Sequence, residues 1–123
     1  MTASVAALLV AGALGTAARS AVVVAVARVS PGFPSGTIVV NLVGSLLFGV
    51  VWGATEGLAR ESEVRLALLT GFLGAFTTFS TLAFDTLQLA ASGRAPAAVG
   101  SALGQLVVGV VLAGVGLAVG RTL

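Results

Sequence analysis

The sequence predicts an all-α integral membrane protein in which four helices cross the bilayer as one domain, residues 1–123. Of its 123 residues, 58% are hydrophobic and only 8% are charged, whereas a soluble domain carries about 25% charged residues. The apolar residues gather into four stretches, about 3–26, 36–53, 66–89 and 97–120. Because about 20 helical residues cross the hydrocarbon layer, we expect a multi-pass protein of the cell membrane, surrounded by lipid.

The first stretch contains a single charged residue, Arg19. It begins without a basic segment and is longer than the apolar part of a signal peptide. We therefore interpret it as a membrane span and not as a cleaved leader. Pro31, Gly32 and Pro34 mark the loop that follows it, because proline and glycine interrupt helices.

The second stretch carries three polar residues, Thr37, Asn41 and Ser45, at helical spacing. Residues at i, i+4 and i+8 lie on one face of a helix. A polar side chain inside the membrane needs partners and is a candidate for a function. The alternative is that this stripe only joins neighbouring helices through hydrogen bonds.

The third stretch has an unusual centre between residues 71 and 81. Two glycines, Gly71 and Gly74, precede four hydroxyl residues within five positions. Glycine lowers helix propensity by ~1 kcal/mol relative to alanine, and serine and threonine can bond back to carbonyls and bend a helix. We therefore predict a break near the middle of the membrane, where freed carbonyls can hold a cation and N–H and O–H groups can face an anion. A continuous helix with a hydroxyl-rich packing face is the alternative.

The fourth stretch holds a second amide, Gln105, with Ser101 one turn earlier. It also contains several glycines, which let membrane helices approach closely. We attribute those glycines to packing alone.

The loops give no clear orientation in the membrane. Half of the charged residues lie between positions 56 and 65, which predicts a water-exposed loop. The side with the termini carries Arg60, Arg65 and Arg121, and the other side Arg28, Arg94 and the approaching Arg19. Because the excess of basic residues sets orientation, this balance permits insertion both ways and hence an antiparallel dimer. A small bias resolved during insertion is the alternative.

The composition excludes several kinds of chemistry. The chain has no cysteine, histidine or tyrosine, so disulfides, thiolate metal sites and the usual general base are absent. We expect no enzymatic activity. The six arginines form no basic cluster, so we expect no nucleic-acid partner.

The first three spans contain three motifs of glycine, polar and aromatic residues. They are Gly12-x-x-Gly15-x-x-x-Arg19, Gly36-Thr37-x-x-x-Asn41-x-x-Gly44-Ser45 and Gly71-Phe72-x-Gly74-x-x-Thr77-Thr78-Phe79-Ser80-Thr81. Together they resemble the Fluc (CrcB) family of fluoride channels. The third is the most specific, and the match covers the first three spans in order and the fourth loosely. The resemblance implies a passive fluoride-selective channel. It also implies a dual-topology antiparallel dimer with two pores and a structural sodium ion at its centre.

The resemblance also implies roles for single residues. The backbone carbonyls of Gly74 and Thr77 from both subunits would hold the sodium, which prefers hard oxygen ligands. Phe79 would line the pore with its electropositive ring edge. The donors that replace fluoride's water would be Asn41, Ser80 and Thr81, with Thr37 as a secondary candidate. Arg19 would have an electrostatic or structural role near a pore mouth.

The chain departs from the family pattern at three positions. Leu82 stands where a second pore phenylalanine is expected, Asp85 where glutamate is usual, and Gln105 where serine or threonine is common. Leu82 leaves open a non-conducting partner subunit of a heterodimeric channel. A small multidrug exporter is a further alternative, but it needs a carboxylate inside the membrane. All four acidic residues here lie in the middle loop or near the end of a span.

Overall fold

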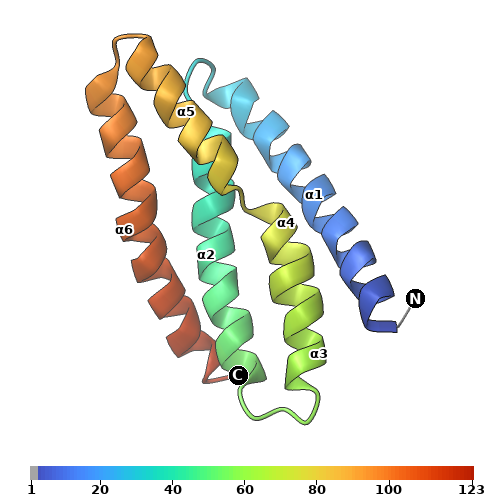
Figure 1. Cartoon of the computed structure of the whole chain (residues 1–123). Helices are drawn as coiled ribbons and strands as arrows, with labels where there is room; N and C mark the ends of the chain where they lie inside the picture. Colours follow the sequence, from blue (N-terminus) through green and yellow to red (C-terminus); the bar gives the residue numbers. More distant parts are fainter. Residues whose placement is uncertain (1–2) are drawn as a thin grey trace.

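The computed structural model describes residues 3–123, which form helices joined by short connections (Figure 1). The helices α1 (Ala3–Val29), α2 (Ser35–Thr55) and α6 (Ala95–Gly120) are continuous. The third span, Glu61–Ala91, consists of α3 (Glu61–Arg65), a π-helical segment η1 (Leu66–Leu73), α4 (Gly74–Phe76) and α5 (Phe79–Ala91). These four spans are long and apolar enough to cross a membrane, which confirms the predicted fold class.

The helices extend beyond several predicted boundaries. Residues 61–65 were expected in a loop, but Glu61–Arg65 form α3. Glu61 and Glu63 lie in its first turn and Arg65 at its end. At these positions their charges interact favourably with the helix dipole and stabilise the helix. The loop predicted at residues 92–96 ends earlier, because Pro96 lies in the first turn of α6, where proline is well tolerated.

The most extensive helix–helix contact among the described residues joins α2 and α6, which run in the same direction (Figure 1). Glycines let the two backbones touch. A Cβ atom added at Gly49 would come within 2.1 Å of the Ala113 carbonyl oxygen, and one at Gly116 within 2.1 Å of the Leu46 carbonyl oxygen. The glycine-rich packing inferred from the sequence is therefore a backbone contact between α2 and α6.

Gly116 and Gly114 provide a matched test of this contact. A Cβ atom at Gly114 meets nothing within 4 Å, whereas one at Gly116 also lies 3.0 Å from the Val50 backbone nitrogen. We expect Gly116→Ala to lower stability by ~1–3 kcal/mol, the usual cost of overpacking, and Gly114→Ala to have no such effect. Thermal unfolding of the two variants in detergent measures the difference. Equal melting temperatures would contradict the backbone contact.

The third span changes its neighbour at the break between α4 and α5. Before the break, η1 and α4 pack against α1, and after it α5 packs against α6 (Figure 1). Gly15 permits the first contact, because a Cβ atom there would lie 2.2 Å from the Phe72 carbonyl oxygen. The buried core, Val40, Leu69, Leu73 and Phe76, lies where α2 meets the first half of the third span.

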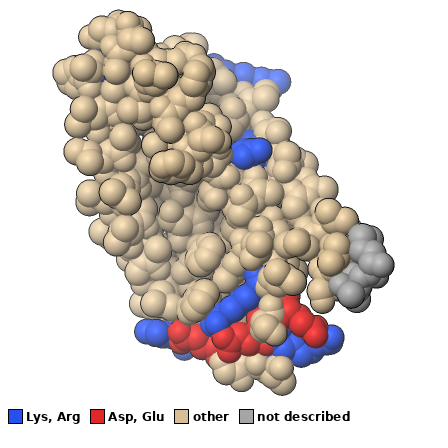
Figure 2. Space-filling view, viewed as in Figure 1, with Lys and Arg blue, Asp and Glu red and all other residues tan. Residues whose placement is uncertain are grey.

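Charged residues gather at one end of the molecule, around the connection between α2 and α3 (Figure 2). Glu56 forms an ion pair with Arg121 at 2.8 Å, and this hydrogen bond lowers the pKa of Glu56. Arg65 binds Glu61 and lies 3.9 Å above the Trp52 ring. Its guanidinium also donates to the Trp52 carbonyl at 3.1 Å, satisfying a carbonyl in the last turn of α2.

Candidate functional site

The predicted break in the third span is confirmed at Thr77 and Thr78. Both residues are extended, with φ/ψ of −81°/162° and −152°/112°. The backbone N–H and the hydroxyl of Thr77 both donate to the Leu73 carbonyl, each at 3.0 Å. The Thr78 hydroxyl oxygen accepts the Thr81 N–H at 3.3 Å. Thr78 therefore caps α5 as its N-terminal residue.

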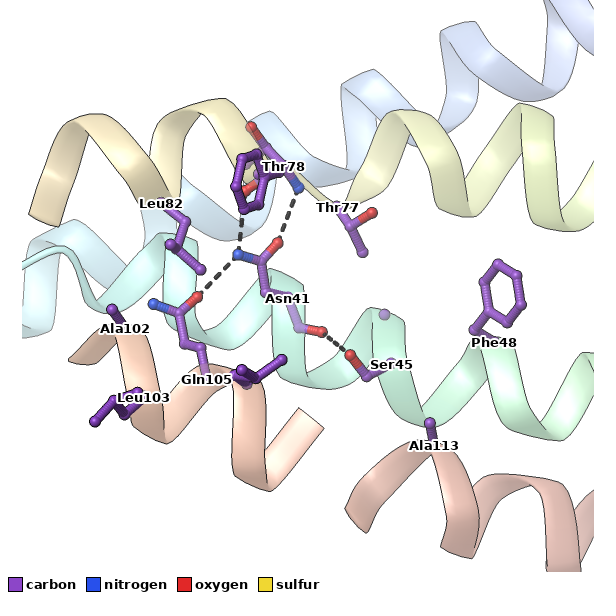
Figure 3. A pocket seen from close by; sticks show the side chains of 13 residues that line it. Asn41, Ser45, Phe48, Thr77, Thr78, Leu82, Ala102, Leu103, Gln105 and Ala113 are labelled. Carbon is purple, nitrogen blue, oxygen red and sulfur yellow. Dashed lines mark hydrogen bonds between the residues drawn. The ribbon is translucent and has the colours of Figure 1, made fainter. Parts of the chain in front are cut away.

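Asn41 on α2 binds the backbone of the break (Figure 3). Its Oδ1 accepts the Thr78 N–H at 2.8 Å, and its Nδ2 donates to the Thr78 carbonyl at 3.2 Å. The same Nδ2 donates to Oε1 of Gln105 on α6 at 2.8 Å. Asn41 therefore joins three segments of the fold. Its role as a donor to fluoride stays a prediction.

The break leaves free the backbone carbonyl groups of Gly74 and Thr77, which the family resemblance implies as sodium ligands. In a continuous helix, the Thr78 N–H would bond to the Gly74 carbonyl and the Thr81 N–H to the Thr77 carbonyl. Here these two N–H groups bond to side chains, those of Asn41 and Thr78. Among the described residues, no hydrogen bond reaches either carbonyl oxygen. Both oxygens are therefore available as ligands.

Gly44 on α2 makes room for the break. A Cβ atom added there would lie 2.1 Å from Cγ2 of Thr77. We expect Gly44→Ala to displace Thr77 and reduce ion flux, and Thr77→Ser, which removes Cγ2 but keeps the hydroxyl, to restore it in the double variant. Flux from liposomes and the yield of assembled protein measure both effects. A double variant no better than Gly44→Ala would exclude this steric cause.

A cavity of about 590 Å³ lies beside the break, between α2, α5 and α6. Its polar lining comes from Asn41, Ser45, Thr77, Thr78 and Gln105, and its apolar lining includes Phe48, Phe79, Leu82, Leu103 and Leu106. The Phe79 side chain is 82% exposed, so it is free to face an ion or a second chain. Leu82, the residue that departs from the family pattern, lines this cavity.

The sequence analysis overlooked one aromatic residue of this cavity, Phe48. It lies near Ala113, at the opposite end of the cavity from Leu82 (Figure 3). Phe48 follows Asn41 by seven positions, which places it on the same face of α2. That spacing was the signal that could have revealed it.

The other predicted site residues lie outside the lining of this cavity. Thr37 is buried and donates its hydroxyl to Asp85 Oδ2 at 2.7 Å. Thr81 accepts a hydrogen bond from the Thr78 hydroxyl at 2.9 Å. Ser80 is exposed at the start of α5, and Arg19 is half-buried on α1. The structure thus brings together Asn41, Phe79 and Thr77, and their roles and those of the other residues stay predictions.

The family model described as CrcB-like protein, Camphor Resistance (CrcB), matches residues 6–117. The chain belongs to the CrcB family. The matched range includes Asn41, the break and Gln105, so every segment around the cavity belongs to the part shared with other CrcB proteins.

Several curated relatives support this assignment over nearly the whole length. A protein of Nitratidesulfovibrio vulgaris (strain Miyazaki F) is 48% identical over 113 residues, covering 90% of this chain and 91% of the relative. A protein of Paracoccus denitrificans is 45% identical over 114 residues, covering 91% and 90%. One of Syntrophotalea carbinolica is 40% identical over 114 residues, covering 91% and 93%. Each of these CrcB relatives is named a fluoride-specific ion channel, FluC.

Proposed function

We propose that this chain is a subunit of a fluoride-selective channel through which fluoride leaves the cell passively. One structural observation carries this function: the third span is broken inside the membrane, beside a cavity with polar groups. The names of the relatives, which are 40–48% identical, supply the ion. The chain is a channel subunit and not an enzyme.

Fluoride is small and holds its water tightly, so a path through the membrane must replace that water with other donors. The first turn of α5 presents backbone N–H groups that have no partner within the helix. The Ser80 hydroxyl and the ring edge of Phe79 lie in the same turn. Chloride is larger and accepts weaker hydrogen bonds, so the same donors offset less of the free energy that chloride loses when it gives up its water.

The cavity lining supports a passive path. It contains no acidic or basic side chain, so it offers no group that exchanges a proton during transport. Asp85, the acidic residue on α5, accepts a hydrogen bond from Thr37 outside this cavity. A proton-coupled exporter requires an intramembrane carboxylate, and this arrangement disfavours it.

The proposed assembly is an antiparallel dimer, formed with an identical chain or with a paralogous subunit. The distribution of arginines supports it, because Arg60, Arg65 and Arg121 lie on one side of the membrane spans and Arg28, Arg94 and the approaching Arg19 on the other. Equal numbers of basic residues on the two sides give no preference for one orientation. The exposed Phe79 ring also provides a surface for a second subunit.

The proposed cofactor is a structural sodium ion bound by the Gly74 and Thr77 carbonyls. Sodium prefers oxygen ligands, and both carbonyl oxygens lack hydrogen-bond donors among the described residues. One chain offers two such oxygens, which are too few ligands for a cation. A two-fold symmetric dimer would supply the same two oxygens from each subunit. When bound, the ion would link the breaks of the two subunits electrostatically.

A flux assay tests the proposed function. Purified protein in liposomes loaded with fluoride should release it, as measured with an electrode, and liposomes loaded with chloride should retain their anion. Absence of release from the protein alone, followed by release when a paralogous chain is added, would support the non-conducting partner subunit. The observation that favours this non-conducting partner subunit is Leu82, which stands where the family pattern has a second pore phenylalanine.

Removing sodium tests the proposed cofactor. We expect dimers prepared in choline or potassium salt at equal ionic strength to dissociate more readily than dimers prepared in sodium salt, because the carbonyls of the two subunits then face one another without a cation. Size-exclusion chromatography and thermal unfolding measure this change. Indifference to sodium would count against Gly74 and Thr77 as ligands.

A further inference from the structure

A buried amide on α6, Gln105, has no assigned role in the proposed function. Its side chain is 8% exposed. Its Oε1 accepts a hydrogen bond from Asn41 at 2.8 Å, and its Nε2 donates to Ser101 Oγ at 3.2 Å. Gln105 thus extends the hydrogen bonds of the break onto α6.

The bond from Asn41 to Gln105 completes the hydrogen bonding of the Asn41 amide. One N–H of Asn41 binds the Thr78 carbonyl, and Gln105 is the acceptor of the other. An apolar side chain at position 105 would leave that second N–H without an acceptor in a partly buried site. Because an unpaired polar group is costly there, the Asn41 amide would rotate toward another acceptor. Its two bonds to Thr78 would then weaken.

Gln105 also lies where the third span changes its neighbour. At the break this span leaves α1, and α5 continues against α6. A bond from Asn41 to α6 therefore connects the break to the helix on which the second half of the span packs.

We propose that Gln105 is a positioning residue of the ion path: its side-chain oxygen orients the Asn41 amide, which in turn holds the Thr78 peptide in the break. Its effect on flux rests on the proposed function, whereas its effect on the break does not. The oxygen of Gln105 matters for this role, and its Nε2 does not.

Three variants of the full-length protein test this role. Gln105→Leu removes the oxygen while keeping much of the side-chain volume, and Gln105→Glu keeps an oxygen acceptor. Ser101→Ala removes only the partner of Nε2. Hydrogen exchange of the peptide that contains Thr78 reports on the break directly, and fluoride release from liposomes reports on the path.

We expect Gln105→Leu to accelerate exchange at the break about fivefold, as loss of one hydrogen bond predicts, and to reduce fluoride release. Gln105→Glu and Ser101→Ala should keep the exchange of the unmodified protein. Release through Gln105→Glu should fall as the pH rises and the new carboxyl ionises, because a negative charge repels the anion. The lining residues of α2, α5 and α6 include no titratable group, so the unmodified protein should lack this pH dependence.

A purely structural role for Gln105 predicts different results. Leucine packs well in a membrane interior, so such a role predicts unchanged exchange in Gln105→Leu, and this result would overturn the proposal. Equal acceleration in Gln105→Leu and Gln105→Glu would also overturn it, because the oxygen would then be irrelevant. Absence of fluoride release from the unmodified protein both alone and with a paralogous chain, with faster exchange in Gln105→Leu but not in Gln105→Glu, would refute the proposed function and support the role of Gln105 in the break.

Discussion

Fluoride release is expected to fall at least about tenfold, a barrier increase of ~1.4 kcal/mol, when Asn41 is replaced by leucine. Asn41 binds both the N–H and the carbonyl of Thr78, at 2.8 and 3.2 Å. Leucine offers neither a donor nor an acceptor. Each buried polar group left without a partner costs ~1–3 kcal/mol, so the break should lose its extended geometry and part of the protein should fail to assemble.

Ser45→Ala is the matched control for Asn41→Leu. Ser45 lies one turn further along the same face of α2, and its hydroxyl donates only to the Asn41 carbonyl of its own helix at 2.8 Å. Because Ser45 also lines the cavity, its removal should leave assembly unchanged and lower flux much less than Asn41→Leu does. Flux is measured in liposomes and expressed per amount of folded protein, which separates conduction from yield. Normal assembly and flux in Asn41→Leu would show that the break does not depend on this amide.

Phe79→Ile is expected to reduce fluoride release at least about tenfold while leaving the proposed dimer assembled. The Phe79 side chain is 82% exposed and lines the cavity beside the break. Because it packs little within its own subunit, its replacement should not unfold the chain. Isoleucine has no electropositive ring edge, so a dehydrated anion would lose a favourable contact.

Phe84→Ile is the control for this second variant. Phe84 lies on the same helix and is 57% exposed, but it does not line the cavity. The Phe84→Ile variant should therefore conduct fluoride like the unmodified protein. Liposome flux measures the difference between the two variants, and size-exclusion chromatography compares their assembly with that of the unmodified protein. Unimpaired release through Phe79→Ile would remove Phe79 from the pore.

The break was predictable because its causes are local. Gly71, Gly74 and the hydroxyl residues after them lie within eleven positions of the sequence, and the structure places the break at Thr77 and Thr78. The hydrogen bonds that hold the break were not predictable, because Asn41 and Gln105 are distant in the sequence from the residues that they bind. The sequence indicated that each amide needs partners, and only the fold shows which partners are close.

Two other features depend on packing between spans. The π-helical segment before the break touches α1 through the Phe72 carbonyl, which approaches Gly15. Nothing in the composition of residues 66–73 predicts that contact, because it requires the position of a different helix. The change of neighbour from α1 to α6 is equally non-local. Local patterns therefore predicted the helices, and tertiary packing determined how the third span is divided between its neighbours.

The glycine contact between α2 and α6 has a consequence for biosynthesis. Residues 56–94, a stretch of 39, lie between the end of α2 at Thr55 and the start of α6 at Ala95, and the ribosome makes the N-terminal part of a chain first. Until α6 emerges, lipid tails must fill the space beside Gly49 and Gly53 that the α6 backbone later occupies. The packing between α2 and α6 therefore forms only after α6 has been made, and a product truncated after Ala91 lacks the surface that displaces those lipids.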